Sequence, residues 1–485
     1  MTEKLIFEKS RTGRKGYSLP SLDIPVKENI LPANLLTEKE PEIVELSERD
    51  VVQHFVRLAR KNFCVDANFY PLGSCTMKYS PKINEKIAAN EKFANLHPYQ
   101  PEKLSQGILK VLYEMERSLS EICAMARFSL QPTAGAHGEL TGNLIIKAYH
   151  QQQGNPRKII LVPDSSHGTN PSSANSVGYN IVTVKSNSFG EIDLEDLTSK
   201  TNEEVAALML TLPNTLGLFE RKILEIAEIL HRYGALLYMD GANMNALLGI
   251  VKPGEMGVDI LHLNLHKTFS TPHGGGGPGS GPIGVTEKLV PFLPVPLIGK
   301  QQGKYFLNYD LPNSIGKVAG FYGNVGVILK AYAYIKALGG EGLKKVAENA
   351  VLNANYLRVL LKNHYLLPYD RICMHEFVLA AVKQKEKLGG ARAAELIGKR
   401  LLDFGFHAPT IYFPLIVHEA LMIEPTETES KEVLDEFAQA LIKIDKEIEE
   451  NPDLVKDAPH TTEVLRLDQA GADRNPILRY RNQGD

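Results

Sequence analysis

A lysine follows an apolar run of strand length, in the segment Asn264-Leu265-His266-Lys267-Thr268. A lysine at the end of a buried strand would emerge at the ligand-binding edge of a sheet. Partial desolvation there favours the uncharged amine, which can form an imine with a carbonyl compound. Most lysines are solvated surface residues, so this position alone does not establish chemistry. Three other segments strengthen the chemical interpretation.

The first of these segments ends in an acid. Leu236-Leu237-Tyr238-Met239-Asp240 is a second apolar run, and its aspartate lies 27 positions before Lys267. A carboxylate in this place could pair with the protonated nitrogen of a heteroaromatic cofactor ring and keep that ring an electron acceptor. Asp is also a favoured N-cap residue, so the cap and the cofactor interpretations of Asp240 both stay open.

The second segment is a turn of small residues, Thr133-Ala134-Gly135-Ala136-His137-Gly138-Glu139, placed before the helical pattern Glu139–His150. Free N–H groups at the start of a helix attract anions, and small side chains let a phosphate approach. The third segment, Pro163–Gly168, follows the apolar run Lys158–Val162 and contains His167. This histidine could lie flat against an aromatic ring, or it could be an ordinary hydrogen-bonded loop residue.

Six apolar runs of strand length predict the elements that position these groups. They are Lys158–Val162, Ile181–Val184, Ala206–Leu210, Ala235–Met239, Ile260–Leu265 and Pro282–Val285, and helical patterns such as Arg221–Tyr233 separate several of them. Wholly apolar strands that alternate with amphipathic helices are typical of a mainly parallel α/β sheet covered on both faces. Ligands of such sheets bind beyond the carboxyl ends of the strands, where the polar segments occur.

The flanking regions differ from this central pattern. The prolines at positions 20, 25, 32, 41, 71 and 81 restrict the backbone and predict an extended arm with only short helices. After the sheet, four helical patterns and one apolar run indicate a smaller α+β domain. The apolar run is Phe377–Val382, and the helical patterns are Val325–Leu338, Gly342–Leu361, Ala391–Phe404 and Ser430–Ile448. The predicted organisation is therefore an arm, 1–85, a large α/β domain, 86–335, and a small C-terminal domain, 336–485.

The composition narrows the class of protein. The chain has 485 residues, of which 43% are hydrophobic and 23% charged, and its net charge is -3 without a strongly basic segment, so nucleic-acid binding is not expected. No run approaches ~18 apolar residues, and the N-terminus lacks a signal-like apolar stretch, so neither a membrane span nor secretion is expected. Four cysteines without CxxC spacing predict a cytoplasmic protein with no disulfide scaffold and no metal site.

The chain order of these features resembles that of the fold type I pyridoxal-phosphate (PLP) enzymes, the aspartate-aminotransferase-like group. The order is the small-residue turn 133–139, then His167, Asp240 and Lys267. Asn264–Lys267 is similar to the N-x-H-K element of the decarboxylases in that group. The resemblance implies that Lys267 binds the cofactor covalently, Asp240 pairs with the ring nitrogen and His167 stacks on the ring. It also implies that Asn264 and His266 lie by the phosphate, and that Ala136 and His137 give it backbone donors.

A narrower resemblance covers nearly the whole chain. Six separated elements are similar to the P-protein (glycine decarboxylase) of the glycine cleavage system, namely Pro71–Lys78, Ala134–Glu139, Asn264–Thr268, Gly274–Pro282, Gly320–Asn324 and Ala458–Thr461. The length and the lysine element match the second, PLP-carrying subunit of the split form. The resemblance implies glycine dehydrogenase (aminomethyl-transferring) activity, in which glycine loses CO2 and its aminomethyl group passes to the lipoyl arm of the H-protein. The implied partner is a homologous first subunit, in an α2β2 assembly.

Other interpretations stay open at the level of sequence. Another fold type I activity, such as an amino-acid decarboxylase or aminotransferase, is the first alternative, and a cysteine desulfurase would need a reactive cysteine that none of the four resembles. A non-catalytic scaffold subunit is the second alternative. Cys75 has no base beside it, which favours a structural role. His262 and His266 have i,i+4 spacing, but they occur in a strand pattern, which disfavours a metal site.

Overall fold

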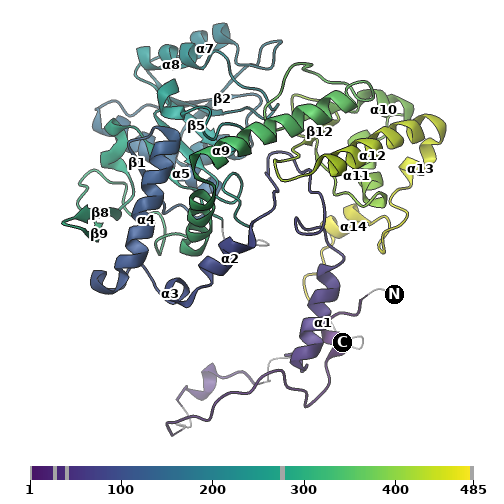
Figure 1. Ribbon diagram of the computed structural model, residues 1–485, viewed down its shortest axis with the longest axis horizontal. Helices are drawn as coiled ribbons and strands as arrows, with labels where there is room; N and C mark the ends of the chain where they lie inside the picture. Colours follow the sequence, from purple (N-terminus) through teal and green to yellow (C-terminus); the bar gives the residue numbers. More distant parts are fainter. Residues whose placement is uncertain (1–2, 26–29, 39–42, 274–278, 481–485) are drawn as a thin grey trace. The chain divides into compact units, whose positions relative to one another are not determined.

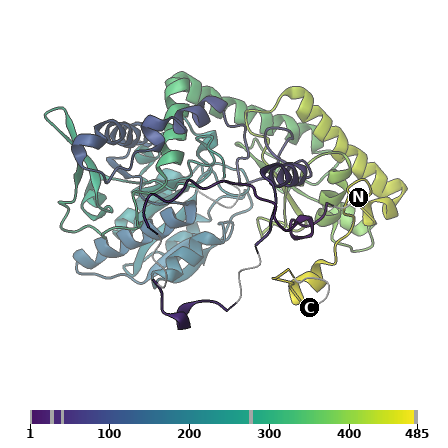
Figure 2. The same ribbon diagram turned by 90° about the horizontal axis from the view of Figure 1, so that it is seen from below.

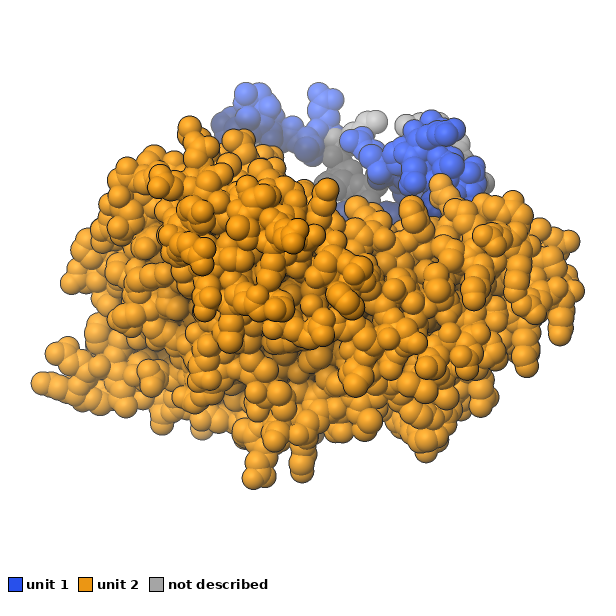
Figure 3. Space-filling model, turned by 90° about the horizontal axis from the view of Figure 1, so that it is seen from above, with its two compact units in different colours: residues 1–67, 459–485 blue, residues 68–458 orange. Residues whose placement is uncertain are grey.

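The computed structural model describes residues 3–25, 30–38, 43–273 and 279–480 (Figure 1). The chain divides into two compact units, residues 1–67 with 459–485, and residues 68–458 (Figure 3). The three-part organisation with boundaries after residues 85 and 335 stays a prediction. The glycine run 274–277, at the start of one element of the resemblance, falls outside the described residues.

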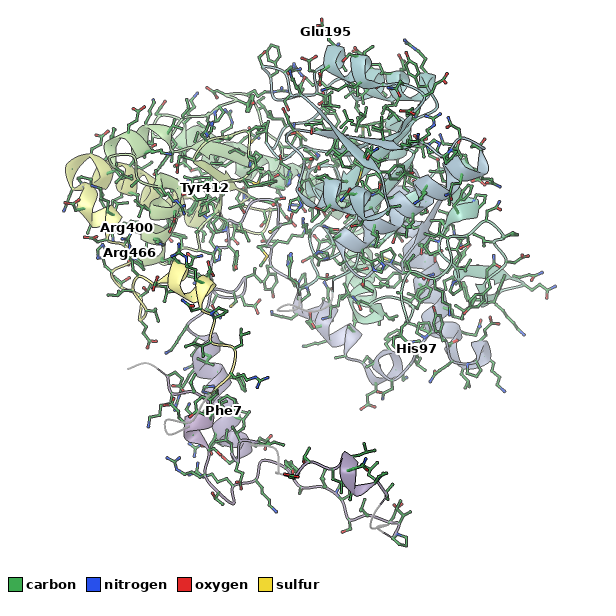
Figure 4. All side chains as sticks on the ribbon, turned by 180° about the vertical axis from the view of Figure 1, so that it is seen from behind. Phe7, His97, Glu195, Arg400, Tyr412 and Arg466 are labelled. Atoms are coloured by element: carbon green, nitrogen blue, oxygen red, sulfur yellow. The ribbon has the colours of Figure 1, made fainter. Side chains whose placement is uncertain are left out.

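The first unit contains short helices joined by irregular chain, as the prolines predict. Its helices are η1 (Phe7–Lys9), η2 (Ala33–Leu35), α1 (Glu48–Ala59) and α14 (Gln469–Arg474). A capping box between Ser47 and Asp50 begins α1. The two ends of the chain meet where Phe7, labelled in Figure 4, stacks on Tyr480 with ring centroids 4.5 Å apart. Many apolar side chains of this unit are exposed, and its described residues contribute to none of the large buried clusters.

A seven-stranded sheet forms the centre of the second unit, in the order β1-β7-β6-β5-β4-β2-β3. Its strands are β1 (Arg127–Ser129), β2 (Ile159–Pro163), β3 (Asn180–Val184), β4 (Val205–Thr211), β5 (Leu236–Gly241), β6 (Ile260–Leu263) and β7 (Ile283–Val285). Strands β2 to β6 are parallel, whereas β7 runs antiparallel to both β6 and β1. All six predicted strands are present, and the mainly parallel α/β class is confirmed.

Helices cover both faces of this sheet, because successive strand residues point to opposite sides. Leu237 and Met239 of β5 pack in one apolar cluster with residues of α4, α8 and α9, whereas Leu236 and Tyr238 pack with α5 in another. The helices around the sheet are α2 (Lys82–Ala88), α3 (Glu91–Ala94), α4 (Glu102–Cys123), α5 (Gly135–Gln152), α6 (Thr169–Ser176), α7 (Leu194–Lys200), α8 (Ile223–Arg232), η3 (Met244–Ala246), η4 (Pro253–Met256) and η5 (Glu287–Phe292). A hairpin, β8 (Leu297–Gln301) and β9 (Lys304–Asn308), lies beside α4.

A smaller antiparallel sheet, in the order β10-β12-β11, follows in the same unit. Its strands are β10 (Phe377–Ala380), β11 (Thr410–Ile411) and β12 (Ala420–Ile423), and its helices are α10 (Val382–Lys387), α11 (Ala393–Asp403), α12 (Lys431–Glu450) and α13 (Pro452–Lys456). Helix α9 (Val325–Leu361) runs from the large sheet to this small sheet (Figures 1 and 2). Gly339 interrupts α9 with φ 61°, between the two predicted helical patterns. Among the described residues, no helix is both long and apolar enough to cross a membrane.

Candidate active site

A cavity of about 170 Å³ opens at the carboxyl ends of β4, β5 and β6, the edge at which parallel sheets bind ligands. Six of the seven predicted site residues line it: Lys267, Asp240, His167, Ala136, Asn264 and His266. The seventh, His137, lies in the first turn of α5 and turns its ring toward Thr133, whose backbone N–H donates to its Nδ1 at 3.1 Å. The structure therefore brings together side chains that the sequence separates by more than 100 residues.

Lys267 lies just beyond β6, in a turn closed by its own N–H donating to the carbonyl of Asn264 at 3.1 Å. The Lys267 Nζ donates to the carbonyl oxygen of Ser74 at 2.7 Å. Ser74 belongs to the Pro71–Lys78 element, so this element reaches the lysine from the far end of the chain. The amine is thus oriented at the cavity wall, where a carbonyl carbon can reach it.

Asp240 occupies the floor of the cavity near the end of β5 and is 3% exposed. Its carboxylate accepts hydrogen bonds from Asn170 Nδ2 at 3.1 Å and from the N–H of Ala242 at 3.0 Å. His262 is its register partner on β6, and His262 Nε2 lies 3.2 Å from Asp240 Oδ1. Burial raises the pKa of Asp240, but His262, these donors and Lys267 together bring it below the ordinary value. Asp240 is therefore a buried anion aimed at the cavity.

The first turn of α5 forms another wall of the cavity. The helix begins at Gly135, four residues before the predicted start, so the small residues 135–138 form its first turn. The N-cap residue, Ala134, makes no side-chain hydrogen bond to the N–H groups of this turn. A Cβ at Gly135 would lie only 2.5 Å from Asn264 Oδ1, so glycine is required for this approach. The Oδ1 of Asn264 is buried without a hydrogen-bond partner among the described residues. The free N–H groups of this first turn fit a phosphate group, whereas the Asn264 Oδ1 is itself an acceptor and would need a donor.

The histidines of the site have different surroundings. His167 is exposed; its Nδ1 lies 2.7 Å from Thr169 Oγ1, and its ring contacts Phe413 edge-on with centroids 5.5 Å apart. His266 accepts a hydrogen bond from the N–H of Ser280 at 3.2 Å. Burial, with the neighbouring His273 and Lys267, lowers the pKa of His266 to about 3, so its ring is neutral. His167 has the exposed ring face that stacking needs, whereas His266 is fixed in the wall.

Several residues of the site were not predicted from the sequence. The spacing of His262 from His266 concerns only a possible metal site, yet in the structure His262 Nδ1 lies 2.7 Å from the Tyr238 hydroxyl while its Nε2 faces Asp240. Glu139 accepts hydrogen bonds from Thr169 Oγ1 at 2.8 Å and from Ser173 Oγ at 3.1 Å. Burial, and then Asp240, raise the pKa of Glu139. The sequence signal for His262 is its place one residue before the end of the strand that neighbours the strand of Asp240.

Two groups of buried side chains among the described residues have the composition of a metal site. They are Glu139, Asp240 and His262, and His375, Glu376 and Glu424, and the ligand atoms in each group lie within 4.8 Å of one another. The first group forms the hydrogen bonds of the cavity floor, and the expectation of no metal stays a prediction. Cys75 is mostly buried; burial raises the pKa of its thiol, although Lys267 opposes this, so the cysteine is not an activated nucleophile.

The fold and this constellation define a class of protein, the fold type I PLP enzymes. Among solved structures, the chain is similar to an inhibitor-bound glycine decarboxylase (P-protein) of the glycine cleavage system, with a TM-score of 0.72 and 23% identity, covering 86% of this chain and 93% of the other. It is also similar in fold to a cysteine desulfurase from Thermococcus onnurineus, with a TM-score of 0.61 and 15% identity, covering 79% and 95% of the two chains. The cofactor of this class is PLP, and the anion-binding turn, the buried aspartate and the lysine fit it.

Sequence comparison identifies the particular family. The sequence model of the glycine cleavage system P-protein family matches residues 16–305, and the family model of the glycine dehydrogenase C-terminal domain matches residues 346–467. The chain is 60% identical to a probable glycine dehydrogenase (decarboxylating) subunit 2 of Caldanaerobacter subterraneus subsp. tengcongensis, with 98% of each chain covered. It is 56% identical to the protein of that name in Bacillus cytotoxicus, with 99% and 97% covered. The chain therefore belongs to the glycine cleavage P-protein family, and it is an enzyme of the glycine decarboxylase type; the alternative activities are not favoured.

Proposed function

We propose that the 170 Å³ cavity is where this chain decarboxylates glycine, with Lys267 as the residue that binds PLP covalently. The observation that carries the assignment is the position of Lys267 Nζ, held at 2.7 Å by the Ser74 carbonyl in a cavity whose floor is the Asp240 carboxylate. A nucleophilic amine and a buried anion at one sheet edge are the two groups that a pyridine aldehyde cofactor needs from its protein.

The other predicted residues take supporting roles in this proposal. The N–H groups of Ala136 and His137 and the side chains of Asn264 and His266 hold the phosphate at the start of α5. His167 would lie against the cofactor ring, and Asp240 would hold a proton on the ring nitrogen. Each role follows from a place in the cavity wall, except that of His137, which acts only through its backbone.

When bound, PLP supplies an electron-accepting ring that stabilises the charge left on the glycine carbon as CO2 departs. The chain's own contribution is electrostatic. Asn170, Thr211 and Ala242 fix the Asp240 carboxylate with three hydrogen bonds, so it is oriented before substrate arrives. When not bound to the cofactor, the Lys267 amine would lie beside the Ser74 carbonyl, where it could move protons.

We also propose the partners that the resemblance implies. The relatives named subunit 2 imply a first subunit, and the arm of this chain carries exposed apolar residues such as Leu19 and Ile30, which are 79% and 74% exposed. Such residues suit a chain that packs on a homologous first subunit in an α2β2 enzyme. The lipoyl arm of the H-protein would then accept the aminomethyl group. The proposed location is the cytoplasm, with no nucleic-acid or membrane partner.

The test is exchange of labelled bicarbonate into the carboxyl group of glycine. The chain with PLP, its co-expressed first subunit and lipoylated H-protein should catalyse exchange, and leaving out any one of these should reduce it to near background. The mass of the active species by light scattering tests the α2β2 assembly. Full exchange by this chain alone would refute the requirement for a first subunit but not the role of Lys267.

A further inference from the structure

Two glutamates that the site described above does not use lie at facing ends of the small sheet. Glu376 directly precedes β10 and Glu424 directly follows β12, and the adjacent residues Phe377 and Ile423 are register partners. Both glutamates are 0% exposed. Their carboxylate oxygens and a ring nitrogen of His375 lie within 4.8 Å of one another. Such a pair of acids inside a protein needs a specific reason, because burying charge is costly.

The two glutamates hold the turn that touches Lys267. The N–H of Ser74 donates to Glu376 Oε2 at 2.7 Å, and the N–H of Thr76 donates to Glu424 Oε2 at 2.9 Å. Ser74 and Thr76 both have positive φ, 65° and 47°, although neither is glycine. A conformation of this kind costs of order 1–3 kcal/mol per residue and persists where its surroundings enforce it. The enforced turn presents the Ser74 carbonyl to Lys267 Nζ.

The pair is also a charge centre beside the lysine. All four carboxylate oxygens accept hydrogen bonds, from Ser74 and Asn243 on Glu376 and from Thr76 on Glu424, which favours an anion. Two buried carboxylates this close cannot both ionise readily. Burial raises the pKa of Glu424 to about 7, and burial together with Glu424 raises that of Glu376 well above its ordinary value.

Among the described residues, four ionisable groups face the two glutamates, and Lys267 is the one that can balance a negative charge on them. The four groups are Lys267, His375, Cys75 and Glu427. Burial and Lys267 lower the pKa of His375 to about 3, so its ring is neutral, and the Cys75 thiol is also uncharged. Glu427 is already paired with Lys78 at 2.8 Å. Lys267 is therefore the group among these four that can balance one negative charge.

We propose that Glu376 and Glu424 share one proton and hold one negative charge against Lys267, and that they position its amine through the Ser74–Thr76 turn. They are positioning residues, since they act on the lysine through the turn and through their charge. The inference rests on the proposed function, because it takes Lys267 to be the residue that binds PLP. One carboxylate suffices for the charge, so loss of either acid lets the other ionise, whereas loss of both removes the charge.

A pH titration of the visible band of the PLP-loaded enzyme tests this. The band reports protonation of the nitrogen that joins Lys267 to the cofactor. Glu376→Gln and Glu424→Gln should each leave the midpoint nearly unchanged, and the double variant should lower it by roughly one pH unit, because a nearby anion favours the charged nitrogen. Glu419→Gln is the matched control, since Glu419 is a buried glutamate next to β12 that accepts from Ala394 N–H instead. A wild-type midpoint in the folded double variant would overturn the proposal.

A second measurement covers the case in which the double variant does not fold. Infrared difference spectra between the wild type and each single variant near neutral pH should show the loss of one protonated carboxyl carbonyl band in both cases. A band that survives in either single variant would mean that the two acids do not share the proton. Failure of the proposed function is distinguishable, because Lys267→Ala would then keep the visible band that all these titrations follow.

Discussion

The two buried histidine–carboxylate clusters of residues 68–458 differ in electrostatics although each combines two acids with one histidine. One consists of Glu139, Asp240 and His262, and the other of His375, Glu376 and Glu424. In the first, both ring nitrogens of His262 have partners, Tyr238 and Asp240, and the pKa of Asp240 is lowered against the effect of burial. In the second, neither nitrogen of His375 has a hydrogen-bond partner among the described residues.

The comparison shows that composition does not decide charge at a buried site. Asp240 has donors on both oxygens and a histidine opposite it on the neighbouring strand, so it is a fixed, buried anion. Glu376 and Glu424 have donors too, but each also faces the other, and the pKa of Glu424 is raised to about 7 chiefly by burial. Asp240 is therefore ionised throughout the neutral pH range, whereas Glu424 gains or loses a proton within it.

The largest effect is expected from Asp240→Asn, which removes the charge of the first cluster at constant shape. The variant should still bind PLP, but the ring nitrogen loses the anion that keeps it protonated, so turnover should fall by roughly 100-fold or more. Bicarbonate exchange measures turnover, and the visible spectrum measures the bound cofactor. Near-normal exchange would show that Asp240 only caps the chain at Ala242.

A matched pair of substitutions separates the two histidines. His262→Leu should lower turnover by about tenfold, because it removes the ring whose Nε2 lies 3.2 Å from Asp240 Oδ1 and which lowers the pKa of that carboxylate; one pKa unit corresponds to ~1.4 kcal/mol. His375→Leu breaks no hydrogen bond of the described structure, and turnover should stay within about twofold of the wild type. Exchange assays on both variants give the comparison. Equal losses would mean that packing, rather than the electrostatic contact between His262 and Asp240, explains the effect.

The smallest effect is a pH dependence of stability. The folded pKa of Glu424 is raised from 4.5 to about 7, so this residue's contribution to stability is fully present below pH 4.5 and is lost as pH rises through about 7. Urea unfolding at about pH 5 and about pH 8 should show that the wild type loses more stability with rising pH than Glu424→Gln does. The Glu419→Gln control should follow the wild type. An equal change in the free energy of unfolding between the two pH values for all three proteins would contradict the raised pKa of Glu424.

Much of the sheet and part of the site were predictable, because they depend on local patterns. The apolar runs predict the six strands. The polar segments that follow two of these runs point to Asp240 and Lys267 as site residues, because the carboxyl ends of parallel strands lie at one edge of the sheet. The α5 start was predicted four residues late, because glycines count against a helix although the residues 135–138 adopt one.

The remaining site residues depend on contacts across long stretches of chain, which local patterns do not contain. Ser74 and Lys267 are 193 positions apart, and Thr76 and Glu424 are 348 apart. Chain spacing relates His262 to His266, but its neighbour in the sheet is Asp240, opposite it on β5. Glu376 and Glu424 follow no recognisable motif; only the pairing of β10 with β12 brings them together.

The role of Lys267 as the residue that binds PLP can be tested directly. Reduction of the loaded enzyme with borohydride fixes the cofactor on its lysine, and peptide mass spectrometry then locates it. We expect the modification in the peptide that contains Asn264–Thr268, on Lys267, and we expect both the modification and the visible band to be lost in Lys267→Ala. Modification of another lysine, such as the buried Lys78, or a band that persists in the dialysed Lys267→Ala protein, would contradict it.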